Sequence, residues 1–362
     1  MTAAILGLGT ASPPYIYNQD EVAEKFISMF NLDEAKSRAL RQLYQNTGIT
    51  KRHSIQSDFK NDRQKWHFWG EDYPKTVPGM GKRNLIYKQE APKLAIQAAE
   101  KALQNWGGNP SELTHVISVS CTGMYAPGIE FELMQALQLN PSVNRLGINF
   151  MGCFGAFKGL SVARAFALEN PQNRILVVCT ELCSLHLQAS QDLDTILGNA
   201  IFSDGAAAIV VGSGEKGLWQ IANLKSIGLQ NSTDKMSWEA SDTGFQMKLS
   251  HKVPVLLGRH IQSFVHDLLP QGLKMDNCDW PIHPGGKSIL QAIEKALGLN
   301  KSQTQASWSV LSDYGNMSSC TFLFVLERLM QQEEQKPWAV GLAFGPGLSL
   351  EGAVFKRLKD KG

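Results

Sequence analysis

Three residues whose side chains suit acyl transfer stand at the boundaries of expected secondary-structure elements. The first, Cys153, follows a short apolar run and a glycine, and small and apolar residues then recur at helical spacing. We therefore expect Cys153 on a tight turn between a strand and a helix. Backbone N–H groups at a helix N-terminus favour a thiolate, which would make this cysteine a nucleophile. The alternative is a buried structural cysteine, because free cysteines are often found in protein cores.

A histidine and an asparagine complete the set. His283 lies in a Pro/Gly-rich loop at residues 280–286, and Asn316 follows a glycine in the segment 313–319. Cys, His and Asn together carry out acyl transfer when a fold brings them side by side. An imidazolium at His283 and the helix N-terminus would lower the pKa of the Cys153 thiol from about 8.5 by several units. We therefore expect a resting thiolate–imidazolium ion pair.

Four motifs, in this order, resemble the type III polyketide synthases, the chalcone-synthase-like branch of the thiolase superfamily. They are Gly152-Cys153, His283-Pro284-Gly285-Gly286, Gly315-Asn316-Met317-Ser318-Ser319 and Phe344-Gly345-Pro346-Gly347-Leu348. The resemblance runs nearly end to end. It implies that Cys153 takes an acyl starter from its carrier and that a malonyl thioester then loses carbon dioxide. It also implies that N–H donors from His283 and Asn316 stabilise the enolate oxygen, where losing one donor typically raises the barrier by about 3 kcal/mol.

The same resemblance implies an α/β protein with the duplicated five-layer αβαβα thiolase fold. We expect an N-terminal half, residues 1–214, that carries the nucleophilic cysteine. A C-terminal half, residues 215–362, would carry the histidine and the asparagine. The apolar run at 174–179 agrees with this fold, because it is typical of a strand covered on both faces. The duplication itself comes from the resemblance and not from a visible repeat.

Local patterns predict where several elements lie. We expect helices at about 18–30, 33–44, 90–106, 255–268, 287–297 and 318–331, and strands at 3–10, 114–121, 174–179, 308–311, 338–343 and 348–355. Residues 58–82 form the least regular stretch, and we interpret them as an ordered surface loop packed by its own aromatic side chains.

The resemblance also assigns residues to a substrate pocket. Phe202 aligns with an aromatic gatekeeper between the coenzyme A tunnel and the cavity, where a hydrophobic plug would exclude water and favour decarboxylation. Met247 falls at a second gatekeeping position, and its flexible side chain suggests an aliphatic substrate channel. Trp238 falls where plant enzymes keep a small residue that limits the starter pocket.

A hydrogen-bonded group that directs ring closure is expected beside this pocket. In aldol-type members of the family it consists of Thr, Glu and Ser, which correspond here to Cys121, Glu181 and Ser318. A thiol is a poor donor, so Cys121 would weaken the network. Thr122 begins a loop, residues 122–128, that in the family walls the active site of the other subunit, and this implies a homodimer.

The region expected to bind coenzyme A departs from the family pattern. In the family, basic side chains meet the coenzyme A phosphates at positions that hold Ala39, Gln42 and Asn46 here, with Arg38 and Arg41 beside them. We name Arg38 and Arg41 as candidate coenzyme A contacts. The departure from the family pattern implies a shifted contact, or a starter delivered on an acyl carrier protein.

Composition excludes several other classes of protein. The chain has 362 residues, 43% of them hydrophobic, and a net charge of +2, so we expect a globular protein that binds neither nucleic acid nor an anionic membrane. Residues 1–6 lack the basic start and cleavage pattern of a signal peptide, and no apolar run reaches the length of a membrane span. We expect a cytoplasmic location.

No metal or bound cofactor is expected, only malonyl-CoA and acyl-CoA or acyl-carrier thioesters as substrates. Cys179, Cys183 and His186 are close in sequence, but no second ligand pair stands at metal-binding spacing elsewhere. We expect all six cysteines to be reduced. Gly7 and Gly9 begin a dinucleotide-like fingerprint that lacks its third glycine, so we reject nucleotide binding there.

The favoured interpretation is a homodimeric type III polyketide synthase that extends a fatty acyl starter and closes an alkylresorcinol or alkylpyrone ring. The preference for a fatty starter depends on Met247 and on Cys121-Thr122-Gly123, which resembles the bacterial alkylresorcinol and alkylpyrone synthases. A β-ketoacyl carrier protein synthase III, which condenses only once, is the nearest alternative. An HMG-CoA-synthase-like enzyme would need a catalytic carboxylate that no motif suggests. A catalytically silent acyl-binding or scaffolding subunit is the remaining alternative.

Overall fold

A mixed β-sheet organises the molecule. The computed structural model describes residues 2–190, 192–214 and 216–358. Within them, nine strands form one sheet in the order β11-β12-β13-β8-β1-β7-β6-β4-β5. Its strands are β1 (Ala3–Ala11), β4 (His115–Ser120), β5 (Asn144–Asn149), β6 (Arg174–Leu182), β7 (Asp204–Ser213), β8 (Trp219–Gly228), β11 (Cys278–Asp279), β12 (Trp338–Gly345) and β13 (Ser349–Arg357). Two small two-stranded sheets pair β2 (Tyr15–Asn18) with β3 (Lys51–Ser54) and β9 (Met236–Ser241) with β10 (Gly244–Leu249).

Helices cover both faces of the large sheet. They are α1 (Gln19–Phe30), α2 (Glu34–Gln45), α3 (Met80–Trp106), α4 (Ile129–Ala136), α5 (Gly155–Glu169), α6 (Leu193–Ile201), α7 (Val253–Leu268), α8 (Lys287–Leu297), α9 (Gln305–Tyr314) and α10 (Thr321–Met330). In the described part of the chain, no helix is both long enough and apolar enough to cross a membrane.

The two halves of the large sheet repeat one strand plan. In the first half β4 pairs parallel with β6, β6 antiparallel with β7, and β7 antiparallel with β1. In the second half β11 pairs parallel with β12, β12 antiparallel with β13, and β13 antiparallel with β8. A short ladder between β1 and β8 joins the halves. This repeat confirms the predicted duplicated α/β plan, while the boundary after residue 214 stays a prediction.

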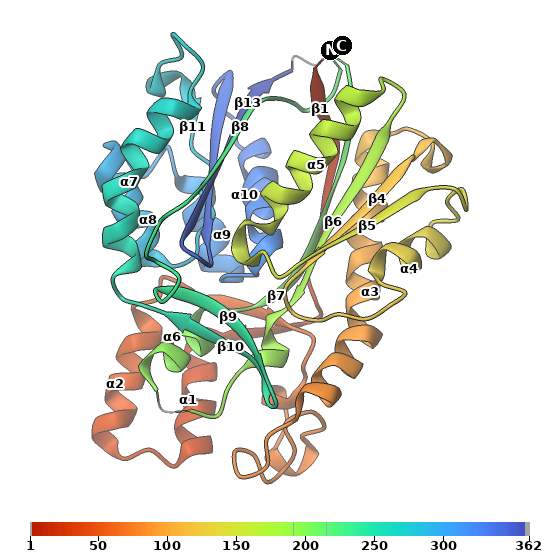
Figure 1. Cartoon of the computed structure of the whole chain (residues 1–362). Coiled ribbons are helices and arrows are strands. Elements are labelled where there is room, and N and C mark those ends of the chain that lie inside the picture. Colours follow the sequence, from red (N-terminus) through yellow and green to blue (C-terminus); the bar gives the residue numbers. More distant parts are fainter. Residues whose placement is uncertain (1, 191, 215, 359–362) are drawn as a thin grey trace.

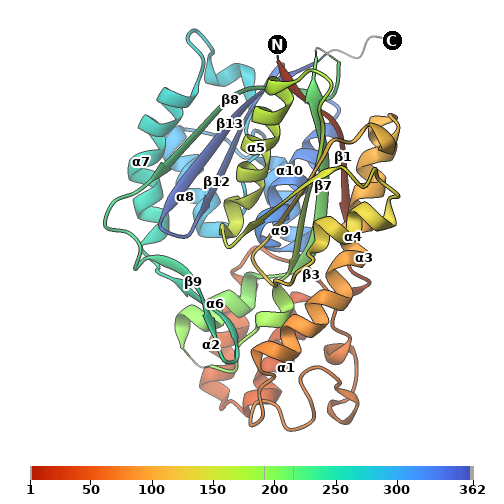
Figure 2. The same ribbon diagram turned by 45° about the vertical axis from the view of Figure 1, so that its right-hand side comes forward.

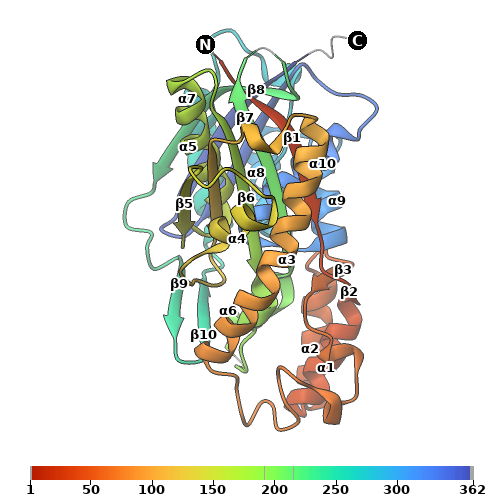
Figure 3. The same ribbon diagram turned by 90° about the vertical axis from the view of Figure 1, so that its right-hand side faces the viewer.

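The elements stack in five layers, as Figure 1 shows. Helix α3 covers the outer face of the first half-sheet, α5 and α10 lie between the half-sheets, and α7 and α8 cover the outer face of the second. Three clusters of buried apolar side chains fill the spaces between these layers. Figure 3 shows the full length of α3, with α1 and α2 at the opposite end of the molecule from the two termini.

Close packing explains the glycines of β1 that begin a dinucleotide-like motif. A Cβ atom on Gly7 would lie 2.2 Å from the carbonyl oxygen of Ala102, and one on Gly9 would lie 2.5 Å from the amide nitrogen of Ala102. Helix α3 therefore rests directly on the backbone of β1, which is possible only without side chains there.

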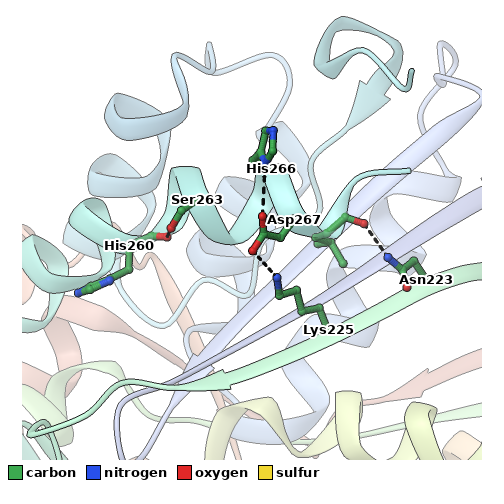
Figure 4. A network of polar contacts seen from close by, with 7 residues as sticks. Asn223, Lys225, His260, Ser263, His266 and Asp267 are labelled. Carbon is green, nitrogen blue, oxygen red and sulfur yellow. Dashed lines mark hydrogen bonds and ion pairs between the residues drawn. The ribbon is translucent and has the colours of Figure 1, made fainter. Parts of the chain in front are cut away.

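Polar contacts fix the end of α7 to β8 at the surface (Figure 4). The Lys225 ammonium lies 2.7 Å from a carboxylate oxygen of Asp267, whose second oxygen lies 3.3 Å from the His266 ring. The Asn223 side chain donates to the carbonyl oxygen of Leu268. Lys225 lowers the pKa of Asp267 below its usual value. Exposed ion pairs of this kind contribute little to stability. Burial of the apolar face of α7 is therefore the main interaction that keeps this helix packed on the sheet.

Two predicted elements differ from the structure. Helix α3 begins at Met80, ten residues before the predicted start, and includes Pro92 in its interior. Pro lacks an amide donor and usually marks a helix start, which is why the sequence favoured a later beginning. Residues 308–311, predicted as a strand, belong to helix α9. Their β-type residues are too few to oppose the packing of α9 against α10.

The irregular stretch before α3 is packed by its own aromatic side chains, as predicted. Trp66, Phe68, Trp69 and Tyr73 are buried. The buried Asp58 carboxylate accepts three backbone N–H groups, from residues 67, 68 and 69, and so orders the loop around one point.

Candidate active site

Cys153 lies on the strand-to-helix turn that the sequence predicts. It is the central residue of a short 3₁₀ turn, Gly152–Phe154, between β5 and α5. The turn requires positive φ angles of 59° at Phe150 and 73° at Gly152. A side chain on Gly152 would also meet the Pro346 ring at 2.4 Å, so only glycine fits before the cysteine. The Cys153 side chain is buried.

The carboxamide of Asn316 lies against the Cys153 sulfur. Its Nδ2 atom is 3.7 Å from Sγ and its Oδ1 atom 3.8 Å from Sγ. The backbone N–H of Ser318 donates to Oδ1 at 2.8 Å, and Nδ2 donates to the carbonyl oxygen of Gly285 at 3.3 Å. These two contacts fix which end of the amide is the donor, so an N–H group points toward the cysteine and the His283 loop.

His283 is buried with both ring nitrogens free. Its exposed fraction is 1%, and its backbone N–H donates to Leu342 of β12. Neither Nδ1 nor Nε2 has a hydrogen-bond partner among the described residues. A buried polar atom without a partner costs about 1–3 kcal/mol, so such a ring is suited to bind a polar atom of a ligand. The structure thus brings Asn316 to the Cys153 sulfur and places His283 in the adjoining loop.

The predicted resting ion pair is not supported. Burial raises the pKa of the Cys153 thiol to about 11, although contacts with Asn316 and Ser318 lower it in part. Burial also lowers the pKa of His283 to about 3. Burial therefore favours the neutral form of both groups. The sequence-based expectation included the helix N-terminus and a nearby imidazolium, but it left out the cost of removing each charge from water.

A small apolar cavity opens over the cysteine. Its free volume is about 20 Å³, which is room for roughly one water molecule. Seven predicted site residues line it: Cys121, Thr122, Cys153, Phe202, Trp238, Met247 and Ser318. Four further residues line it: Gly152, Cys183, Met236 and Pro346. The sequence suggests Cys183 as a pocket-lining residue and Pro346 as part of the cavity scaffold, whereas Gly152 and Met236 were missed as lining residues. Met236 stands two residues before Trp238 in β9, so the alternation of a strand could have identified it.

A hairpin that the sequence did not predict carries three of these residues, Met236, Trp238 and Met247. Trp238 in β9 stands opposite Met247 in β10. The indole N–H of Trp238 donates to the carbonyl oxygen of Cys121 at 2.7 Å, and its ring lies 6.2 Å from that of Phe202. Figure 2 shows this hairpin beside α6, below the large sheet. The hairpin therefore forms a wall of the cavity.

The hydrogen-bonded group around Glu181 differs from the predicted one. The buried carboxylate accepts from the Thr122 hydroxyl at 2.8 Å, from the backbone N–H of Cys121 at 3.0 Å, and from the Ser319 hydroxyl. Ser318 does not contact it and instead bonds Asn316. The Cys121 thiol accepts from the backbone N–H of Gly152. The hydroxyls of Ser120, Thr122 and Ser319 are the side-chain donors to the Glu181 carboxylate, in place of the predicted Cys121 and Ser318. Burial raises the pKa of Glu181.

His186 braces the cavity wall, which agrees with the interpretation of Cys179, Cys183 and His186 as strand-end and pocket-lining residues rather than metal ligands. One ring nitrogen lies 2.7 Å from the carbonyl oxygen of Thr122, and the other accepts from the backbone N–H of Phe245 in β10. The ring is stacked on that of Phe245. Cys183 lines the cavity and Cys179 lies in the core inside β6. All six cysteines are buried and free.

A surface groove of about 490 Å³ approaches the site from outside. It is lined by parts of α2 and α6, the segment before α7, and the loop that follows His283. It reaches Gly285, whose carbonyl oxygen accepts from Asn316. The charged or titratable side chains of its lining are Lys287 and His251.

The two arginines proposed as coenzyme A contacts do not line this groove. Arg41 pairs with Glu24 of α1, with Nε 2.5 Å from the carboxylate, and Arg38 lies 3.8 Å from Glu34 on the exposed side of α2. Their proposed role is therefore not supported by their positions. Asn46, one of the departures from the family pattern, does line the groove.

Comparisons with known proteins agree with this site. A family model for chalcone and stilbene synthases, N-terminal domain, matches residues 1–215, and one for the C-terminal domain matches residues 224–359. A protein of Dictyostelium discoideum named "Probable polyketide synthase 1" is 32% identical over 365 residues. The match covers 98% of this chain but only 11% of the length of that protein.

Two crystal structures share the whole fold. The C-terminal type III polyketide synthase domain of Steely1, a type I/III hybrid from Dictyostelium, superposes with a TM-score of 0.91 at 30% identity, covering 99% of this chain and 100% of that one. PKS-I from the brown alga Ectocarpus siliculosus gives a TM-score of 0.91 at 28% identity and 98% coverage of both. The likeness to bacterial members stays a prediction. This chain belongs to the chalcone and stilbene synthase family, and it is a type III polyketide synthase, an enzyme of the acyltransferase class.

Proposed function

We propose that this enzyme condenses malonyl-CoA units, with loss of carbon dioxide, onto an acyl starter held as a thioester on Cys153. The observation that carries the proposal is the amide nitrogen of Asn316, 3.7 Å from the Cys153 sulfur, beside a buried His283 whose ring nitrogens are both free. Cys153 lines the apolar cavity, and the Asn316 amide lies against its sulfur from outside the cavity lining.

Each step has a residue suited to it. The neutral His283 ring accepts the thiol proton while Cys153 sulfur attacks the starter thioester carbon, and the carrier leaves as a thiol. When malonyl thioester loses carbon dioxide, charge develops on the thioester oxygen. N–H donors of Asn316 and His283 stabilise that oxygen. The resulting carbanion attacks the acyl group on Cys153 and frees the sulfur for the next round.

The carrier arm of the thioester fits the surface groove. The groove lining includes Gly285, whose carbonyl oxygen accepts from the Asn316 amide, so an extended arm that lies in the groove can bring its thioester toward Cys153. Lys287 supplies a positive charge for a phosphate there. The carrier is coenzyme A for malonate, and either coenzyme A or an acyl carrier protein for the starter.

The starter is a fatty acyl chain, and the product an alkylresorcinol or alkylpyrone. Support comes from the apolar lining of the cavity and from the flexible Met247 at its edge. The Glu181 carboxylate, with its Thr122 and Ser319 donors, stands beside the cavity and could direct ring closure.

The enzyme acts as a homodimer in this proposal. Strand β5 is the last strand of the large sheet, and its residues are exposed or half-buried. Leu146 in β5 is 39% exposed, and Met124 in the loop after β4 is 50% exposed. An edge strand with apolar side chains beside it is suited to pair with a second copy of the chain.

Separate assays of two partial reactions test the mechanism. Starter loading is followed by the intact mass of the protein, and decarboxylation by carbon dioxide released from malonyl-CoA. Cys153→Ala is expected to abolish loading. Asn316→Ala is expected to load starter and to lose decarboxylation by a factor of about a hundred or more. Equal loading of wild type and Cys153→Ala would refute the role of the cysteine.

A further inference from the structure

We infer that Arg52, a buried residue of β3 outside the cavity, is a positioning residue that holds both Phe202 and Asn316 in place. The inference rests on the proposed function. The carbonyl oxygens at the end of α6, the helix that leads into Phe202, need hydrogen-bond donors from other parts of the chain. The last four carbonyl groups of a helix have no partner inside it, and a buried helix end must find partners elsewhere.

Three other elements supply those partners. The Arg52 guanidinium donates through Nη1 to the carbonyl oxygen of Asn199 at 2.5 Å and to that of Phe202 at 3.1 Å. The Gln19 side chain donates to Ala200 at 2.7 Å. The backbone N–H of Asn316 donates to Ile201 at 2.9 Å. The C-terminal end of α6 therefore forms hydrogen bonds with both Arg52 and Asn316, and it leads directly into Phe202.

Arg52 is a buried arginine without a carboxylate partner in the described part of the chain, so other groups must stabilise its charge. Arg52 is 5% exposed and forms no ion pair with any residue that the structure describes. Burial lowers the pKa of its guanidinium. The C-terminal end of a helix carries a partial negative charge, and the guanidinium faces two of its carbonyl oxygens. The Tyr44 ring, 5.7 Å from the guanidinium carbon, gives a second favourable contact.

The helix end is connected directly to the site. Phe202 and Asn316 form a parallel β-bridge, and the backbone N–H of Ser203 donates to the carbonyl oxygen of Asn316 at 2.9 Å. Asn316 is therefore held on both sides by the chain that Arg52 secures. If the Arg52 donors are lost, the carbonyls of Asn199 and Phe202 are left buried without partners, and this segment must shift to reach water.

Three variants test the inference. Arg52→Met removes the charge and the donors, Arg52→Lys keeps the charge, and Lys51→Met is a matched control from an exposed neighbour in β3. Each is assayed for loading of Cys153 and for kcat and KM of malonyl-CoA decarboxylation. We expect Arg52→Met to lower kcat for decarboxylation on the order of tenfold to a hundredfold, the effect of a misplacement of about 1 Å. Loading should change far less, because Cys153 sits on a different element. Arg52→Lys should recover part of kcat, and Lys51→Met should match wild type.

The result that overturns the inference is a loss of loading and decarboxylation by the same factor, or no change in either. If Arg52→Met does not fold, as judged by circular dichroism, Arg52→Lys decides: a lower kcat with unchanged loading supports the role, and wild-type values refute it. Failure of wild type to decarboxylate malonyl-CoA contradicts the proposed function itself, which separates the two conclusions.

Discussion

Burial determines how the central residues behave before substrate arrives. The Cys153 thiol and the His283 ring are both buried, and burial is the main cause that raises the pKa of the thiol and lowers the pKa of the ring. In the proposed mechanism, the proton transfer from Cys153 to His283 therefore takes place during the reaction and not in the resting enzyme. Substrate binding supplies a polar atom for the free ring nitrogens.

The pH dependence of alkylation tests this resting state. A cysteine with a raised pKa is mostly neutral below that value, and only its thiolate reacts. The iodoacetamide rate at Cys153 in the free enzyme should therefore be low at pH 7 and rise with pH toward about 11. Peptide mass spectrometry follows the rate, with Cys153→Ala as the blank. A rate that is already at its plateau below pH 7 would show a resting ion pair instead.

Sequence motifs predicted which residues form the site better than they predicted the hydrogen-bond partners of those residues. Cys153 and Asn316 meet as predicted, because each motif marks a turn that points a side chain into the site. The choice of Ser318 over Ser319 as partner of Glu181 was wrong. Ser318 has a φ of 52° at the start of a 3₁₀ turn, so two neighbouring serines face different groups, and a sequence pattern carries no such angle.

The β9–β10 hairpin controls the space available to the starter. Trp238 covers the cavity and is held by Cys121, while His186 holds the opposite strand at Phe245. With a free volume of about 20 Å³, the cavity cannot take an acyl chain until this wall moves or Met247 changes its conformation. In the proposed function the starter occupies this cavity, and the hairpin is then the element that limits its size.

Shortening the tryptophan should shift starter preference. Trp238→Ala enlarges the cavity, so kcat/KM for a long-chain acyl-CoA relative to a short-chain one should rise roughly tenfold, the worth of about one methylene group. Trp238→Phe is the control for the lost hydrogen bond, since it keeps an aromatic ring. Competition between two starters, read by product mass, measures the ratio. A ratio unchanged in Trp238→Ala would show that the starter does not occupy this cavity.

Helices and strands with a clear hydrophobic periodicity could be predicted from the sequence. Segments whose residue types favour a different structure, or whose pattern is interrupted, could not. The predicted helix at 287–297 coincides with α8, where apolar residues recur on one face and Gly298 ends the helix. Residues 308–311 read as a strand because Trp and Val favour strands, yet the surrounding chain packs them in α9. The hairpin gave little signal, because polar residues interrupt both strands and their role depends on distant partners.

Duplication explains why the site lies where the two halves meet. Helices α5 and α10 form the central layer, and each follows a short 3₁₀ turn, Gly152–Phe154 and Ser318–Cys320. Cys153 lies in the first turn, and Asn316 stands just before the second. Cys153, the proposed nucleophile, thus lies in the part of the chain that matches the N-terminal family model, and Asn316, the proposed donor, in the part that matches the C-terminal model. The resemblance predicted this arrangement, whereas the matching strand pairings could be seen only in the structure.

A charge in the edge strand should break the proposed dimer. Leu146→Glu places a carboxylate on β5, and burying it against a second copy would cost several kcal/mol. Light scattering after size exclusion should show a dimer for wild type and a monomer for Leu146→Glu. Val255→Glu, at an exposed position of α7, is the control and should stay dimeric. A monomeric wild type would contradict the proposal.

In the proposed function, Cys153 carries the growing acyl chain through repeated condensations. The most direct measurement is the mass of products formed from labelled malonyl-CoA and a panel of acyl-CoA starters, from acetyl through long-chain to aromatic, with Cys153→Ala as the blank. We predict products that contain two or more malonate-derived units, formed best from a long-chain starter and absent from the blank. Products that stop at one unit would contradict the account and point to a single-condensation synthase.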